Sequence, residues 1–148
     1  MTQNQFSKLL NSPLPTDPKL IHGQLENGLS YFILPNTHPE QRAELRLVVR
    51  AGSILEDEDQ LGLAHIVEHM AFNGTKRFKP GEISAYFESV GAQFGAHVNA
   101  TTSFDETIYK LTIPTDEITI IERSLDLFRD WCSDLSFLPQ EIERERKV

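Results

Sequence analysis

Along the 148-residue chain, the spacing of apolar side chains changes between the two-residue period of strands and the 3.6-residue period of helices. The first part predicts three strands, at residues 20–26, 29–34 and 43–51. Asn27 and Gly28 separate the first two strands and favour a tight hairpin turn, because both residues tolerate a positive φ. In the third strand, apolar and charged residues alternate, which predicts burial of one face only.

The middle of the chain predicts two helices and then a second pair of strands. Helical spacing covers residues 59–73 and 80–90, and a glycine follows each segment, where it favours the end of a helix. Alternating residues then predict strands at 93–99 and 106–113, joined by a turn at 101–105. These two strands are expected to form another hairpin.

Two amphipathic helices complete the pattern. Thr115 is expected to cap the first, whose apolar stripe ends at Trp131, and Cys132 is expected to fill the core beside it. The second begins at Pro139 and reaches Val148 without a residue that ends helices, so we expect a truncated C-terminus. The order of elements predicts an α+β fold with a mixed or mainly antiparallel sheet and helices packed on one face.

Charge and composition narrow the function classes. The formal net charge is −8 and no segment concentrates Lys and Arg, which argues against a nucleic-acid-binding surface. No apolar run is long enough for a membrane span, and the N-terminus lacks the apolar segment of a signal peptide. Residues 1–18 contain three prolines and are expected to form an extended arm, followed by one incomplete domain at 19–148.

The candidate chemistry lies in His65, Glu68 and His69. At about 100° per residue, the two imidazoles and the carboxylate fall on one face of the expected helix. Imidazole nitrogens are zinc ligands, and a catalytic zinc site keeps three protein ligands and a water. Glu68 is then expected to be the general base that takes a proton from this water. The apolar residues of the helix are expected to pack on the opposite face, and they are Leu63, Ile66, Val67 and Met70.

Simpler explanations exist for the same residues. A short H-x-x-E-H pattern also occurs by chance, as an ordinary histidine pair on an amphipathic helix. His97 is expected to be an exposed strand histidine and not a ligand.

Residues 61–75, which read LGLAHIVEHMAFNGT, resemble the motif helix of the inverzincins, the pitrilysin and insulin-degrading-enzyme family of zinc peptidases. Residues 99–109 and the strand end at 50–53 resemble two further parts of these proteins, so the likeness covers roughly residues 20–148. The resemblance implies the N-terminal half-domain of this family, with one Zn²⁺ per full domain. Bacterial envelope members are the most similar, which implies a periplasmic or cell-envelope location.

The resemblance also implies the ligand set. His65 and His69 bind zinc, Glu68 activates water, and the third ligand is a glutamate seven residues after the Glu of a Glu-Arg pair. Glu145 begins such a pair, so the ligand would fall four residues beyond Val148, outside this chain. Glu145 itself is the second candidate ligand by its spacing from His69. Otherwise it is expected to orient one of the two histidines through a hydrogen bond, or to be solvated.

Family members bind peptides as an added strand at a sheet edge, and the resemblance places Asn99 and Ala100 at that edge. Phe72 is a candidate wall of the substrate cleft, with core packing as the alternative. The expected partners are a peptide or unfolded-protein substrate and a second homologous half-domain. The expected function is that of a zinc-dependent endopeptidase domain, inactive on its own. The alternative is a non-catalytic peptide-binding or assembly subunit of the same fold, and a purely structural zinc site is least favoured.

Overall fold

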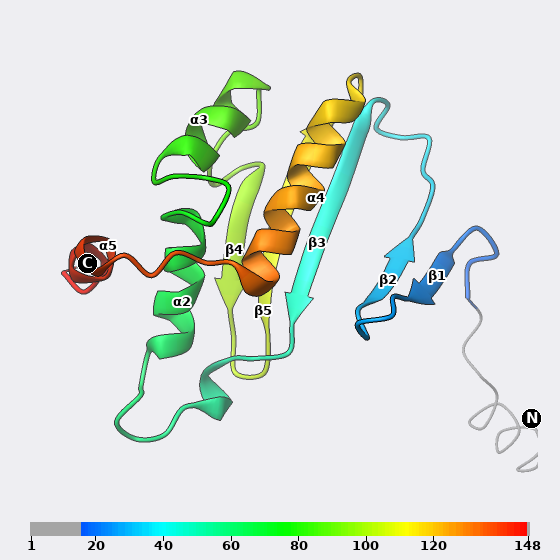
Figure 1. Ribbon diagram of the computed structural model, residues 1–148. Coiled ribbons are helices and arrows are strands. Elements are labelled where there is room, and N and C mark those ends of the chain that lie inside the picture. Colours follow the sequence, from blue (N-terminus) through cyan, green and yellow to red (C-terminus); the bar gives the residue numbers. More distant parts are fainter. Residues whose placement is uncertain (1–15, 148) are drawn as a thin grey trace, which may run out of the picture. The chain divides into compact units, whose positions relative to one another are not determined.

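The computed structural model describes residues 16–147, and the chain divides after Glu40 into two compact units (Figure 1). In the described part of the first unit, two strands form a hairpin; the second unit contains a three-stranded sheet and four α-helices. Most of the arm expected at 1–18 lies outside the described residues.

The first unit contains β1 (Ile21–Gln24) and β2 (Ser30–Ile33), which pair antiparallel. Gly28 has a φ of 90°, and the Asn27 side chain accepts a hydrogen bond from the backbone N–H of Leu29 at 3.1 Å. Both features stabilise the tight turn. The predicted first hairpin is therefore confirmed.

The sheet of the second unit has the order β3-β5-β4, with both pairs antiparallel. Its strands are β3 (Arg42–Val49), β4 (Val98–Thr102) and β5 (Thr107–Pro114). Successive residues of β5 are alternately buried and half-buried, so one face of the sheet carries the core. The α+β class with an antiparallel sheet is confirmed.

The strand expected at 93–99 is wrong in position, because β4 begins only at Val98. Gly95 has a φ of 83°, which an extended strand does not allow, and its N–H bonds to the carbonyl of Val98. The following turn moves with the strand, and Ser103 closes it by bonding to the carbonyl of Glu106 at 2.8 Å. The chain around residues 91–97 therefore forms turns before the sheet resumes.

The four predicted helices are present, preceded by a short 3₁₀ turn, η1 (Ser53–Leu55). They are α2 (Leu63–Phe72), α3 (Glu82–Ser89), α4 (Ile118–Ser133) and α5 (Pro139–Glu145). In Figure 1, α4 lies in front of the sheet and α2 stands beside β4, and the two helices contact β5 and β4 respectively.

Three of these helices begin later than expected. Gly62 precedes α2 with a φ of 91°, and the Glu56 carboxylate accepts hydrogen bonds from the N–H groups of Gly62 and Ala64 at 2.8 and 2.7 Å. These bonds lower the pKa of Glu56, and the bond from Ala64 has the larger effect, followed by the bond from Gly62. They also satisfy backbone donors at the start of the helix. The cap predicted at Thr115 is wrong, since Glu117 is the residue before α4 and makes no side-chain cap bond.

Trp131 joins α4 to both the sheet and α2. Its ring stacks on Tyr109 of β5 with centroids 4.7 Å apart, and its Nε1 donates to the carbonyl of Ala71 at 2.8 Å. Cys132 is exposed, so its predicted place in the core is wrong. Because consecutive helical residues point about 100° apart, the inward position of Trp131 turns its neighbour outward.

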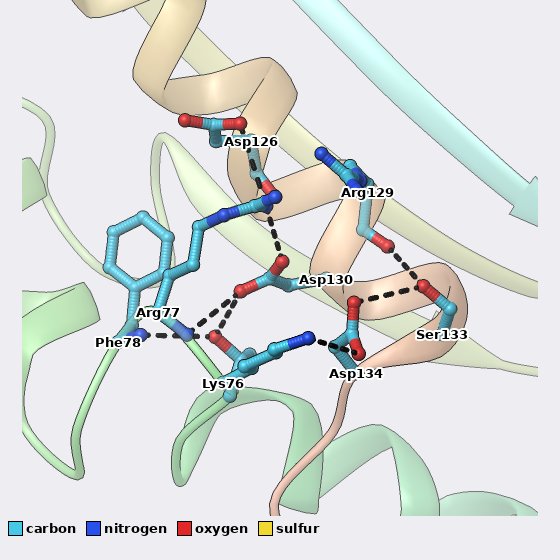
Figure 2. Close-up of polar contacts among 9 residues, drawn as sticks. Lys76, Arg77, Phe78, Asp126, Arg129, Asp130, Ser133 and Asp134 are labelled. Atoms are coloured by element: carbon cyan, nitrogen blue, oxygen red, sulfur yellow. Dashed lines mark hydrogen bonds and ion pairs between the residues drawn. The ribbon is translucent and has the colours of Figure 1, made fainter.

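Asp130 fixes the segment after α2 to α4 (Figure 2). This carboxylate has 0% exposure and accepts hydrogen bonds from the Thr75 hydroxyl at 2.7 Å and the Arg77 backbone N–H at 3.1 Å. It also pairs with the Arg77 guanidinium, which donates to the carbonyl of Asp126 at 3.2 Å. We call Asp130, Thr75 and Arg77 the Asp130 cluster.

The Asp130→Ala substitution should lower the free energy of unfolding by about 3 kcal/mol, because Arg77 and Thr75 lose their shared buried acceptor. Urea denaturation of the chain measures this change. Asp126→Ala is the matched control, since this carboxylate is 46% exposed and 3.5 Å from Arg77. It should cost less than about 1 kcal/mol. Equal losses for the two variants would contradict a special role for Asp130.

Candidate metal and catalytic site

His65 and His69 lie one turn apart on α2, and their Nε2 atoms are 3.1 Å from each other. Two nitrogens that each lie about 2.05 Å from a tetrahedral zinc are about 3.3 Å apart. The His65 side chain is exposed and that of His69 is 38% exposed, so an ion could reach both nitrogens. The donor pair therefore fits the first two positions of a zinc site.

Glu145, the last residue of α5, holds the other nitrogen of His69. One carboxylate oxygen lies 2.8 Å from Nδ1 of His69, and the other accepts a hydrogen bond from Nδ2 of Asn73 at 2.7 Å. The hydrogen bond from His69, followed by the one from Asn73, lowers the pKa of Glu145. Because an ionised carboxylate only accepts, a neutral His69 in this contact carries its proton on Nδ1, and its Nε2 lone pair is left for another partner.

Glu68 is buried between α2 and β4, with 7% exposure. Its carboxylate accepts a hydrogen bond of 2.6 Å from the Thr102 hydroxyl. Burial, with a smaller contribution from the Glu68 charge, raises the pKa of the nearby Tyr109 phenol to about 12. The Glu68 carboxylate is therefore held in one orientation beside the core.

The expectation that the polar face of α2 points away from the packing surface is wrong for Glu68. Leu63 and Val67, expected inside, are 48% and 39% exposed, whereas Met70 is fully buried. A helical wheel gives the relative directions of side chains but not which direction faces the sheet. Here the edge between the polar and apolar faces packs against β4.

Two residues of the site were not identified from the sequence. Asn73 lies four residues after His69, so the helical spacing that joins the two histidines also predicts this neighbour. Thr102 carries no such local signal, because its contact with Glu68 depends on the position of β4, which the sequence pattern misplaced.

The residues expected at the substrate edge lie on β4, an outer strand of the sheet in the part of the chain that is described. The backbone N–H of Thr112 donates to the carbonyl of His97 at 2.7 Å. In an antiparallel ladder, every second residue pair is hydrogen-bonded, and in this register Ala100 belongs to a pair that is not, so its N–H points away from β5. That N–H instead donates to the side-chain oxygen of Asn99 at 2.9 Å. The backbone of Ala100 therefore lies on the free edge of the sheet.

Phe72 packs among aromatic side chains. Its ring centroid lies 5.1 Å from Phe94 and 5.3 Å from Trp131. Phe94 is 44% exposed, so the cluster extends from the core to the surface. His97 accepts a hydrogen bond on Nδ1 from the backbone N–H of Gln93 at 3.1 Å.

Within residues 16–147, no three His, Cys, Asp or Glu side chains are grouped to hold a metal ion. The two facing imidazole nitrogens and the neighbouring Glu68 carboxylate are present, and no further His, Cys, Asp or Glu of the described residues completes a metal-binding group with them. None of the helices in the described residues is long and apolar enough to cross a membrane.

A sequence model of the family described as Insulinase (Peptidase family M16) matches residues 31–148. The chain belongs to the M16 insulinase family. This confirms the resemblance to the inverzincins that residues 61–75 carry.

Individual relatives agree with this M16 assignment. The chain is 44% identical over 138 residues to the probable zinc protease PqqL of Haemophilus influenzae, which covers 93% of the chain and 15% of the relative. The crystal structure of the periplasmic protease PqqL from Escherichia coli matches with a TM-score of 0.88 and 43% identity, over 93% of the chain and 15% of that protein. The chain thus spans about 15% of the length of these relatives, in their first part, since the structure of the first half of Escherichia coli PqqL matches equally well.

Glu145 should make the stability of the chain depend on acid pH. Its pKa is lowered in the folded state, so its stabilisation is complete above the unfolded pKa, about 4.3, and is lost as the pH falls through the lower folded value. Glu145→Gln should therefore be less stable than the parent at pH 7, with a difference that disappears in strong acid. Urea unfolding from pH 7 to pH 2 tests this.

Glu143→Gln is the control for that titration, because this side chain is 60% exposed and pairs only with Arg146 on the surface. Its effect should be small and nearly independent of pH. If the Glu145→Gln difference stays constant from pH 7 to pH 2, the carboxylate is not stabilised by its partners.

Proposed function

We propose that this chain is the metal-binding part of a zinc-dependent endopeptidase, in which His65 and His69 supply two ligands and Glu68 is the general base. The observation that carries the proposal is the pair of facing Nε2 atoms 3.1 Å apart, in an M16 chain, with the buried Glu68 beside them. We further propose a glutamate outside the described residues as the third ligand, and that the chain alone is inactive.

The residues of the chain have distinct parts in the proposed reaction. Zinc at the two imidazoles would polarise the scissile carbonyl and lower the pKa of a water molecule. Glu68 would accept a proton from that water and return it to the leaving amine. The Thr102 hydroxyl holds the carboxylate in place through its 2.6 Å bond, so Glu68 need not reorient before it acts.

The proposed substrate is a peptide or an unfolded protein that adds a strand to the free edge of β4. The outward N–H of Ala100 would bond to the substrate backbone after the Asn99 side chain releases it. Such binding relies on main-chain groups and tolerates many sequences. Phe72 is the proposed wall of the cleft, and a second homologous half-domain would close it.

The relatives support a proposal for the location, and the site residues bear on the alternative function. We propose a periplasmic or cell-envelope location, because a solved relative with 43% identity is described as periplasmic. The alternative is a non-catalytic peptide-binding or assembly subunit. The histidine pair and the oriented Glu68 favour the peptidase, since a binding subunit has no chemical need of them.

Glu68→Gln, made in the protein expressed from its complete gene, should retain zinc and lose at least about 100-fold in kcat for peptide hydrolysis. The amide can still accept the Thr102 bond but cannot take a proton from water. Metal analysis and a fluorogenic peptide assay measure the two effects. Glu88→Gln, an exposed change on α3, is the control and should leave both unchanged.

Two outcomes would reject the peptidase proposal. If Glu68→Gln hydrolyses peptides at the parent rate, Glu68 is not the base. If the parent protein contains no zinc when it is purified in the absence of chelators, the non-catalytic alternative is favoured instead.

Ala100→Pro should raise KM for peptides about tenfold, because it removes only the N–H at the free edge and leaves the β4–β5 ladder intact. Zinc content should not change. Steady-state kinetics with a series of peptides measures the effect. The control, Thr101→Val, keeps the backbone donor and should retain the parent KM; an unchanged KM in Ala100→Pro would exclude binding at this edge.

A further inference from the structure

Asn73 ends α2, yet its side chain does not cap the helix. Its backbone N–H bonds to the carbonyl of Met70, and the chain then turns at Gly74, whose φ is 125°. The positive φ favours glycine at position 74, and a Cβ there would also lie in tight contact, 3.3 Å from the carbonyl oxygen of Phe78. The backbone completes the helix end, and the Asn73 amide is available for another contact.

That contact is with Glu145 on a different helix. Asn73 and His69 are four residues apart, so both side chains project from the same face of α2. Nδ2 of Asn73 donates to one carboxylate oxygen of Glu145 at 2.7 Å, while Nδ1 of His69 lies 2.8 Å from the other. Each oxygen of the Glu145 carboxylate thus has a hydrogen-bond partner on α2, and the two bonds together hold the plane of the carboxylate.

We propose that Asn73 is a positioning residue, which holds Glu145 so that it accepts the Nδ1 proton of His69 and leaves Nε2 free to bind a metal. The effect on zinc rests on the proposed function, whereas the effect on the proton position does not. Asn73 acts through Glu145 and does not itself touch the reacting atoms.

Glu145 joins α5 to α2. Helix α5 has seven residues, and none of them is buried. Its contacts with α2 include the two hydrogen bonds to Glu145, its last residue. The orientation of the carboxylate therefore depends on these polar partners, His69 and Asn73.

The histidine pair is sensitive to this orientation. A neutral imidazole carries its proton on one nitrogen, chosen by the hydrogen bonds that the two nitrogens make. With the His69 proton on Nδ1, Nε2 of His69 carries the lone pair and lies 3.1 Å from Nε2 of His65. If Glu145 turns away, the His69 proton is free to move to Nε2, where it blocks the lone pair that a metal needs.

The proton position can be measured without any metal. The chain is labelled with ¹⁵N in its histidine rings, treated with a chelator, and studied by NMR above the pKa of the imidazoles. The parent should show His69 protonated at Nδ1. In Asn73→Ala, and in Asn73→Leu, which keeps the branching at Cγ without a donor, the Nε2-protonated form should increase.

Arg146→Ala is the control, because it changes the residue next to Glu145 on the surface and removes only the 2.8 Å pair with Glu143. It should retain the Nδ1 proton. In the protein from its complete gene, Asn73→Ala should weaken zinc binding by about tenfold or more, measured against a competing chelator. When combined with Glu145→Ala it should add no further loss, since Asn73 acts through that carboxylate.

The proposal is wrong if His69 stays protonated at Nδ1 in both Asn73 variants while their NMR spectra remain those of the folded chain. It is also wrong if the losses of zinc affinity from Asn73→Ala and Glu145→Ala are additive. If no variant and no parent binds zinc, the proposed function fails, but the proton position in the metal-free chain still decides the role of Asn73.

Discussion

The site on α2 depends on the burial of one carboxylate, Asp130. A charge with no exposure is tolerated only when it is paired and hydrogen-bonded, and here the Thr75 hydroxyl and two groups of Arg77 meet that need. Both partners belong to the segment that directly follows α2. Trp131, the next residue along α4, bonds to the carbonyl of Ala71 near the end of the same helix. The last turn of α2 is therefore fixed to α4, and that turn carries His69.

The orientation of α2 about its own axis explains why His65, Glu68 and His69 have different surroundings. Met70 and Ala71 occupy the core, which turns Glu68 toward β4 and leaves the two imidazoles at the surface. In the proposed site, the base needs a fixed direction, which the Thr102 hydroxyl would provide, whereas the two histidine ligands would need access for the ion. The same orientation exposes Leu63 and Val67, so the helix carries apolar surface that its own pattern predicts to be buried.

The sequence predicted what depends on local periodicity. Helix type, the antiparallel hairpins and the shared face of His65 and His69 all follow from spacing, and the structure contains them. The position of β4 did not follow from the spacing. The alternating residues around Gly95 match a strand, but the left-handed φ of Gly95 is incompatible with an extended backbone. The burial of Glu68 was also beyond a helical wheel, since it depends on how α2 packs against the sheet.

The position of Glu145 distinguishes two possible roles for this residue, that of a third zinc ligand and that of a residue that orients His69. Its distance from His69 along the sequence makes Glu145 a candidate ligand, but its carboxylate lies on the Nδ1 side of the His69 ring, while Nε2 faces His65. Its second oxygen is already bonded to Asn73. To bind an ion shared by the two Nε2 atoms, Glu145 would have to give up both contacts and move around the ring. A carboxylate that orients a histidine ligand does so from this side, and the arrangement favours that role for Glu145 over the role of a ligand.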